Sequence, residues 1–497
     1  MLSKLALLAG LVGLAAADTC TTIEATAASI DVVRELNPSY TSTLNDYWST
    51  SCTALKPSCI LYPSSPREVS AILGVLSASN NTERFAVKSG GHNPNNYWSS
   101  VQGGPLISTD KLDHVLLDPD TGVVRVGPGN RWTNVAEALD GSGWSVVGGR
   151  LSDVGVGGYL VGGGLSFMSG QHGWAADSVL EYELVLANGT VVTASEDANH
   201  DIWLALRGGG NNFGVVTSFT VQAYRQDDVF GGVMVFTASD ETDARILAAI
   251  RDFTVHNRDG KASLIPAAVR STVDLVDAWF VFTFYDGPEP PEGIFKNFTD
   301  AGPTINTSKR RSYADLVKTN NWAIIRGSVY MIGTETVPLP PPASDVNVLE
   351  EVHAHWRNVT DDVQWVGGIT ASIGYQPFSR AMARVAREKG GDLLDLDDDV
   401  DYIVLEVNSC FFYQKDYERM AQALRDVYEG ARGLVEAWMD EGVVDAGAHT
   451  PLFANDAFHE QDLFARMRPE HQALARSVAD DLDPEGLFRD RTGGWKP

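Results

Sequence analysis

The sequence has few basic residues and no long apolar run, and each shortage excludes a class of partner. Its 38 lysines and arginines face 65 aspartates and glutamates, which gives a net charge of −27. Nucleic acids and anionic membranes bind basic patches, so we expect neither as a partner. No stretch approaches the ~20 apolar residues that a membrane-spanning helix needs. At 497 residues the chain is long enough for two domains with large cores.

Several common catalytic and binding motifs are absent as well. The sequence has no Gly-x4-Gly-Lys-Ser/Thr phosphate loop, no Gly-x-Ser-x-Gly nucleophile turn and no His-Glu-x-x-His zinc pattern. His353 and His355 would diverge on a helix, so we interpret them as surface residues and predict no metal site. Gly155-Val-Gly157 lacks the third glycine of the Rossmann fingerprint and opens no evident helix, which disfavours a βαβ dinucleotide site.

The N-terminus has the pattern of a secretory signal peptide over residues 1–17. Lys4 supplies a positive charge, residues 5–14 are apolar, and three alanines at 15–17 offer a cleavage site before Asp18. We therefore expect secretion to the extracellular space. Glycan acceptor sequons, which fit that route, occur at Asn80, Asn188, Asn297, Asn306 and Asn358.

Only four cysteines are present, three of them near the N-terminus. In an oxidising compartment they permit at most two disulfides. We favour a Cys20–Cys59 disulfide, which would fasten the N-terminal tail to the first strand. The pairing of Cys52 and Cys410 stays open.

Hydrophobic patterning predicts an α+β fold with two domains. Residues 18–225 combine short strands with helices, including a helix within 64–79 and a hairpin around Asn188-Gly189. Residues 226–440 hold longer alternating segments and helices at 241–253 and 417–440, which predict an antiparallel sheet covered by helices. The proline-rich run 337–342 is expected to be a surface loop. Residues 441–497 are expected to return to the first domain.

The most informative stretch is Val-Lys-Ser-Gly-Gly-His-Asn at residues 87–93. Gly90 and Gly91 leave backbone N–H groups uncovered, which suits a diphosphate, and His92 would lie within reach of what that diphosphate carries. Taken alone, the same triplet also occurs in ordinary turns. Two further glycine-rich loops, at 148–164 and 208–214, are interleaved with apolar residues. That mixture indicates buried backbone against a flat ligand rather than a flexible linker.

Five ordered motifs resemble the FAD-binding half of the berberine-bridge-enzyme-like oxidases, in the vanillyl-alcohol-oxidase superfamily. They begin at residues 87, 124, 154, 162 and 206, and they read VKSGGHN, VRVGPG, VGVGG, GGGLS and LRGGGNNFGVV. The chain most resembles the exported fungal branch of that family. The resemblance implies a two-domain PCMH-type fold, with FAD in residues 18–225 and a substrate domain in residues 226–440.

The resemblance also implies which residues hold the FAD. They are Lys88, Ser89, Gly90, Gly91, His92, Asn93, Val154, Gly155, Gly157, Gly158, Gly162, Gly163, Asn212, Val215 and Asn455. The histidine that matches His92 is bonded to the 8α-methyl of the flavin in such proteins. Many relatives add a second link through a cysteine three residues before Val154, but this chain has Leu151 there. His92 is therefore expected to be the only covalent tether.

The implied reaction is that of an FAD-dependent oxidase with a small-molecule substrate. Hydride passes from an alcohol-type or secondary-metabolite C–H to the flavin, a base takes the O–H or N–H proton, and O2 reoxidises the flavin to give H2O2. In the family, valine at position 154 accompanies oxygen access and leucine its exclusion, so Val154 favours an oxidase.

The base is not supplied by the resemblance. Relatives often have Tyr-x-Asn-Tyr where this chain has Phe453-Ala-Asn455-Asp456, so both tyrosines are missing. Our candidates for catalysis are Tyr375, Glu406, Asn408 and Asp456, with Gln376, Asn455 and His459 as further polar residues near them in sequence. Glu406 and Asn408 have the same parity on one predicted strand, so they share either the flavin face or a solvated face of the sheet.

Three alternatives remain open at this point. The first is an oligosaccharide oxidase that forms lactones, although the absence of the second flavin link weighs against it. The second is a cyclase of a biosynthetic pathway, which uses the same pocket for ring closure. The third is a non-catalytic protein that retains the flavin as a structural element.

Overall fold

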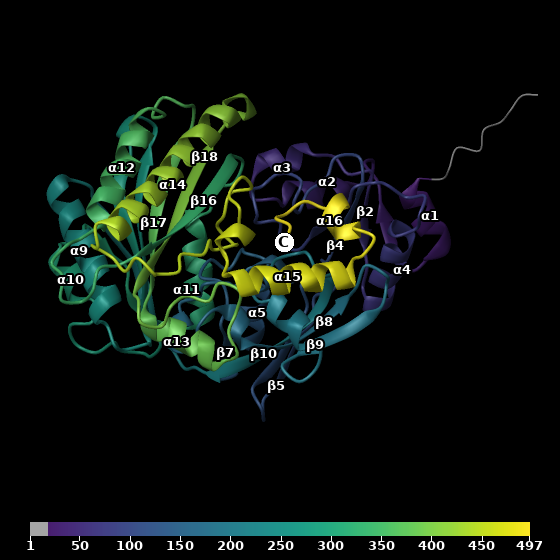
Figure 1. Ribbon diagram of the computed structural model, residues 1–497, viewed down its shortest axis with the longest axis horizontal. Coiled ribbons are helices and arrows are strands. Elements are labelled where there is room, and N and C mark those ends of the chain that lie inside the picture. Colours follow the sequence, from purple (N-terminus) through teal and green to yellow (C-terminus); the bar gives the residue numbers. More distant parts are fainter. Residues whose placement is uncertain (1–17) are drawn as a thin grey trace, which may run out of the picture.

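The computed structural model describes residues 18–497, so the expected signal peptide lies outside the described residues. Figure 1 shows the N-terminal half, in purple to blue, beside a second half in teal and green whose large sheet is covered by helices. The C-terminal segment, in yellow, runs back across the N-terminal half. No helix within residues 18–497 combines the length and the apolar character needed to cross a bilayer.

The first sheet is small and mostly parallel. Its order is β1-β2-β4-β3, from Asp31–Val33, Cys59–Tyr62, Pro105–Ser108 and Ala86–Lys88, with β1 antiparallel to β2. Helix α4 (Pro66–Leu76) begins with Ser65 as its cap and buries Val69, Ile72, Leu73 and Leu76. A disulfide joins Cys20 in helix α1 (Thr19–Thr26) to Cys59 in β2, which confirms the predicted pair. Cys52 and Cys410 are separate buried thiols.

The second sheet is antiparallel and carries the glycine-rich loops. Its order is β5-β6-β10-β8-β9, with β7 paired to β10, from Val115–Asp118, Val123–Val126, Val215–Arg225, Val179–Val185, Val191–Ser195 and Trp144–Val146. The β8–β9 hairpin turns at Asn188-Gly189, where Gly189 has φ of 81°, as the sequence predicts. Helices α5 (Trp132–Leu139), α6 (Val156–Val161), α7 (Ser169–His172) and α8 (His200–Ala205) pack around it. Helix α6 starts directly after Gly155, so the prediction that no helix opens there is wrong.

The third sheet forms the second half and is antiparallel, as predicted. Its order is β14-β11-β13-β12-β17-β18-β16, with β15 paired to β11. The bounds are Ile305–Asn306, Val229–Thr237, Asp277–Tyr285, Ala262–Ser271, Thr370–Phe378, Tyr402–Phe411, Val329–Pro338 and Lys309–Arg311. Helices α9 (Asp240–His256), α12 (Leu349–Asp361) and α14 (Tyr417–Asp440) pack against one face (Figure 1). The opposite face packs against helix α11 (Tyr313–Thr319) at β11 and β13, and its remaining part lines the site.

Two predictions in this half are wrong. The expected surface loop at 337–342 begins inside the sheet, because Val337 and Pro338 end β16 and are buried. Since β16 closes one edge of the sheet, a terminal proline costs it little pairing. His353 is not a surface residue: it is 4% exposed on α12, bonds Tyr375 Oη through Nδ1 at 3.1 Å, and stacks on Trp279.

The C-terminal segment contacts both halves. Helix α15 (Pro469–Leu482) is followed by α16 (Leu487–Arg491), whose Phe488 packs edge-to-face on Phe85 beside the first sheet. Further upstream, Arg466 forms an ion pair with the buried carboxylate of Glu335 on β16, with Nη2 2.6 Å from Oε1. Upstream of both contacts, residues 453–456 pass along the site. The remaining helices are α2 (Pro38–Asn45), α3 (Thr50–Ala54), α10 (Lys296–Asp300) and α13 (Arg380–Glu388).

Candidate active site

One cavity of about 670 Å³ lies between the glycine-rich loops and the face of the third sheet opposite α9, α12 and α14. All the residues expected to hold FAD line it except Lys88 and Gly163, and they do so together with polar residues of β18 and of the C-terminal segment. The lining members are Ser89, Gly90, Gly91, His92, Asn93, Val154, Gly155, Gly157, Gly158, Gly162, Asn212, Val215, Asn455, Asp456, Glu406 and Asn408. The site is therefore shared by segments that lie far apart in the chain.

The close approach of two loops requires glycine on both sides. A Cβ on Gly90 would lie 2.6 Å from Gly155 Cα, and a Cβ on Gly155 would lie 2.3 Å from the Gly90 nitrogen. Ser89 fixes the approach, because its Oγ donates to Pro128 O at 2.6 Å and accepts from Gly157 N at 3.2 Å. The result is a cradle of bare backbone, which suits a diphosphate and a flat ring system.

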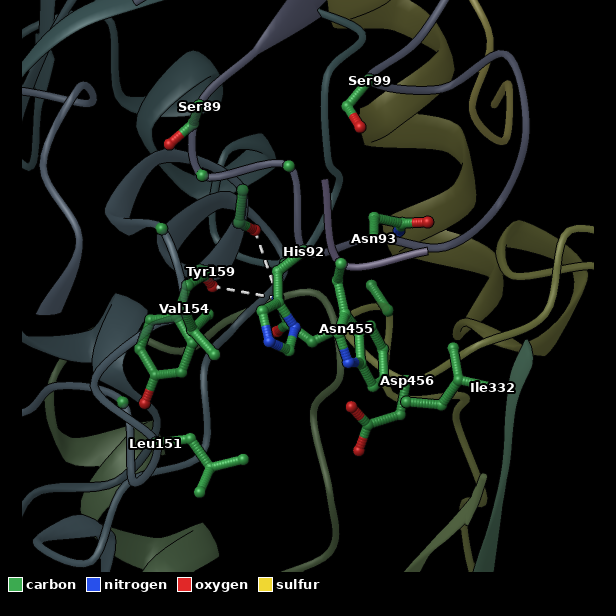
Figure 2. A pocket seen from close by; sticks show the side chains of 18 of the residues that line it. Ser89, His92, Asn93, Ser99, Leu151, Val154, Tyr159, Ile332, Asn455 and Asp456 are labelled. Atoms are coloured by element: carbon green, nitrogen blue, oxygen red, sulfur yellow. Dashed lines mark hydrogen bonds between the residues drawn. The ribbon is translucent and has the colours of Figure 1, made fainter. Parts of the chain in front are cut away.

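Asn455 fastens the C-terminal segment to this cradle. Its Oδ1 accepts from Gly164 N at 3.0 Å, and its Nδ2 donates to Gly158 O at 3.2 Å. A Cβ on Gly162 would lie 2.6 Å from the Asn455 amide, so that glycine leaves room for the contact. Asn455 and Asp456 line the same cavity as His92 (Figure 2).

An ion-pair network that the sequence did not reveal supports the same loops. Arg131 donates through Nη2 to Gly90 O at 2.8 Å and to Asp46 Oδ2 at 2.6 Å. Asp46 also pairs with Lys88 Nζ at 3.3 Å. Neither Arg131 nor Asp46 belongs to a recognisable sequence motif. Only their contacts in the structure show that they support the site.

His92 lies at the centre of the cavity wall in an unusual environment (Figure 2). Burial, and then the charges of Arg131 and Arg326, lower its pKa to about 3, so the imidazole is neutral at physiological pH. Its Nε2 is buried, and residues 18–497 offer it no hydrogen-bond partner. An unpaired buried nitrogen of this kind is costly unless a further group satisfies it.

Trp48 holds the His92 ring from one side. The two rings stack with centroids 4.4 Å apart, and Trp48 stacks in turn on Tyr330 of β16 at 4.1 Å. The backbone supports this arrangement, because Trp48 N donates to Gly91 O at 3.1 Å. The stack therefore connects the histidine loop with the third sheet.

Two carboxyl groups face the loops from the other side of the cavity. Asp456 is buried, and burial together with the nearby Glu406 charge raises its pKa to about 8. Burial also raises the pKa of Glu406, while Arg150 opposes that shift. Gln376 donates through Nε2 to Asp456 Oδ2 at 3.0 Å and accepts from Arg150. Such a pair holds one proton near neutral pH and can exchange it with a bound molecule.

Strand register explains which predicted catalytic residues reach the cavity. Glu406 and Asn408 alternate with buried residues on β18 and line the cavity. The sequence left open whether they lie on the flavin face or on a solvated face of the sheet, and they lie on the face that lines the cavity. The prediction that Tyr375 is catalytic is wrong. Tyr375 points to the helix-covered face of β17, is 0% exposed and bonds His353. Strand alternation excludes it from the site.

Four other predicted residues do not line the cavity, and one of them is Gln376, whose bonds to Asp456 and Arg150 are given above. Lys88 is buried behind the loop, where it pairs with Asp46 and donates to Ser89 O, so it supports the cradle from outside. Gly163 has φ of 107° and faces Leu394 and Phe453. His459 is not part of the lining either, and its backbone N–H donates to Asn95.

Known proteins resemble this chain in sequence and in structure. A family model described as an FAD binding domain matches residues 57–195. An uncharacterized FAD-linked oxidoreductase of Arthroderma benhamiae is 38% identical over 95% of this chain and 93% of its own length. The chain belongs to the FAD-linked oxidoreductases. The FAD-dependent monooxygenase tpcD of Cochliobolus heterostrophus is 31% identical over 90% of this chain and 86% of its own.

Solved structures show the fold of this FAD-linked oxidoreductase. 6-Hydroxy-D-nicotine oxidase from Arthrobacter nicotinovorans superposes with a TM-score of 0.74 at 20% identity, over 93% of this chain and 97% of its own. Xylooligosaccharide oxidase from Myceliophthora thermophila C1 gives 0.74 at 19% identity, over 97% and 100%. The fold class and the cofactor predicted from the motifs are thus confirmed, and the residues present fit FAD. The bare cradle can take the diphosphate, and His92, whose Nε2 finds no hydrogen-bond partner within residues 18–497, lines the same cavity.

Proposed function

We propose that the protein is an exported oxidase that removes hydride from an alcohol-type or secondary-metabolite substrate, with O2 as the final acceptor and H2O2 as product. The observation that carries the proposal is the carboxyl pair Glu406–Asp456 facing the histidine loop across one cavity. FAD supplies the hydride acceptor when it is bound. The chain's own residues must then orient the substrate and accept its proton.

The proton acceptor in this proposal is the Glu406–Asp456 pair. Its members hold one proton between them, since burial and mutual repulsion oppose a double charge. Gln376 orients Asp456 by a hydrogen bond, and Arg150 partly offsets the negative charge. A substrate O–H or N–H that reaches the pair loses its proton as the C–H bond breaks. Asn408, beside Glu406 on the same face, is the neutral group that orients the substrate.

We further propose that His92 carries the FAD through a bond to the 8α-methyl group. A neutral imidazole with an unpaired, buried nitrogen supports this, because only the neutral form has a free lone pair for bonding. Leu151 lines the cavity where many relatives have their cysteine, so no second link is expected.

The experiment is to precipitate the purified holoprotein with acid and to measure flavin in the pellet and in the supernatant. We expect the wild-type flavin to stay in the pellet and that of His92→Ala to wash out. His114→Ala, which removes a histidine bonded to Ser218 outside the cavity, is the matched control and should behave as the wild type. Wild-type flavin that washes out completely would refute the covalent link.

Oxygen use is tested without knowing the substrate. Val154 lines the cavity beside Gly155, and Trp132 N donates to its carbonyl at 3.0 Å, so its backbone is held in place. Photoreduced wild-type protein should reoxidise rapidly in air and release H2O2, and Val154→Leu should reoxidise more slowly. Equal rates in the two proteins would remove Val154 from the oxygen path.

Secretion and glycosylation complete the proposal. The asparagines of all five sequons are exposed, which leaves them open to glycan transfer. Protein recovered from the medium of a eukaryotic host should begin at Asp18 and lose mass on treatment with an N-glycosidase. Retention inside the cell with residues 1–17 intact would contradict this part.

A further inference from the structure

The cavity face of the third sheet is divided into two zones by strand register. Across β13 and β12, Phe282 pairs with Ile265 and Phe280 with Ala267, and Val269 follows on the same face. These five residues line the cavity, and none carries a polar side-chain atom. We call them the apolar platform.

Polar groups continue the same rows on the neighbouring strands. Val269 pairs with Ser372 on β17, and Ser372 pairs with Asn408 on β18. In the next row Ala267 pairs with Gly374, which pairs with Glu406. Because paired side chains on one face lie about 5 Å apart, the platform ends within two strands of the carboxyl pair.

Trp322 closes the platform on its exposed side. It stacks on Phe282 with centroids 6.0 Å apart and lies 5.3 Å from Phe280. It is nevertheless 52% exposed, although it lines the cavity, so much of its ring is available to a bound molecule. Its neighbours Asn320 and Asn321 bond Arg150 O and Ser152 Oγ, which anchors this segment to the flavin half.

We propose that the apolar platform and Trp322 form the subsite for the flat, aromatic or polycyclic body of the substrate. The substrate's single ionisable O–H then lies over the polar zone, within reach of Glu406 and Asp456. This inference rests on the proposed function, which it extends by naming the substrate class. It selects an apolar phenol or alcohol over an oligosaccharide.

The energetic reason is the cost of unpaired hydroxyl groups. A sugar of two or more rings carries hydroxyls along its edges, and each one buried without a partner is costly. The five platform side chains offer neither donors nor acceptors. A planar hydrocarbon body instead gains from burial against Phe280, Phe282 and Trp322, with an additional contribution from ring packing.

The test uses two probes, 2-naphthol as an apolar phenol and cellobiose as a sugar. Each is titrated anaerobically into the oxidised holoprotein, and binding is followed through the change in the visible absorbance of the flavin. We expect 2-naphthol to bind and cellobiose to produce no change. Trp322→Ala should raise the Kd of 2-naphthol about tenfold, equivalent to ~1.4 kcal/mol.

Trp365→Ala is the matched control. Trp365 is 79% exposed and does not line the cavity, so its loss should leave the Kd unchanged. Cellobiose binding as tight as 2-naphthol, or an unchanged Kd in Trp322→Ala, would overturn the subsite. The readout is binding without turnover. If 2-naphthol binds as expected while no reduced protein ever yields H2O2, the oxidase proposal fails and the subsite stands.

Discussion

Replacing Asp456 by asparagine should change the pH dependence of stability in a calculable way. Burial and the Glu406 charge raise the pKa of Asp456 from its ordinary 3.8 to about 8. Between pH 3.8 and about pH 8, Asp456 keeps a proton in the folded protein that it has lost in the unfolded chain. Stability associated with this group is therefore fully present below about pH 4 and is lost as the pH rises through about pH 8.

The size of the effect follows from the shift. A rise of about four pKa units at ~1.36 kcal/mol each amounts to ~5 kcal/mol when complete. An asparagine side chain carries no charge at any pH. The free energy of unfolding of Asp456→Asn minus that of the wild type should therefore rise by ~1.4 kcal/mol per pH unit between about pH 5 and pH 7. Taking the difference between the two proteins cancels the titration of His92, whose lowered pKa acts in the opposite direction.

The assay is urea unfolding of the two holoproteins at a series of pH values. The free energy of unfolding of the variant minus that of the wild type should rise steadily with pH. Asp197→Asn, at an exposed position without an ion pair in the part of the chain that the structure describes, controls for the loss of one negative charge. Parallel profiles for the wild type and Asp456→Asn would refute the assignment of the shifted proton.

Two further predictions concern the contacts between the halves. Trp48→Leu removes the ring that stacks on His92, so more flavin should appear in the supernatant after acid precipitation; a pellet fraction equal to that of the wild type would exclude a positioning role for Trp48. Arg466→Ala leaves the Glu335 carboxylate buried without its ion-pair partner and should lower the free energy of unfolding by ~3 kcal/mol. Urea unfolding measures this loss, and a change below ~1 kcal/mol would show that water or a rearranged side chain replaces the arginine.

Local sequence determined the elements whose signals are short-range. The Asn188-Gly189 turn, the capped helix after Ser65 and the long helix at 417–440 are where the sequence predicts them, because turn chemistry and helical periodicity act over a few residues. The cofactor also followed from sequence in two steps. Three glycine-rich loops indicate a large planar ligand with a diphosphate, and the resemblance of five ordered motifs to a flavoprotein family implies that this ligand is FAD.

Predictions from local sequence were wrong where tertiary context overrides local preference. Strand β16 continues through Val337 into Pro338 because an edge position tolerates proline. His353 is buried because Trp279 and Tyr375 surround it, and no neighbouring residue in the sequence indicates that.

For the site itself, the sequence alone determined the residue types: a histidine after two glycines, a carboxylate after Asn455, and a leucine in place of a second flavin link. Only the tertiary structure decided which of them meet. Strand pairing turned Glu406 to the cavity and Tyr375 away from it, and the return of the C-terminal segment placed Asp456 beside Glu406. The physical reason is that a shifted pKa arises from burial and from neighbours, and both belong to the folded chain.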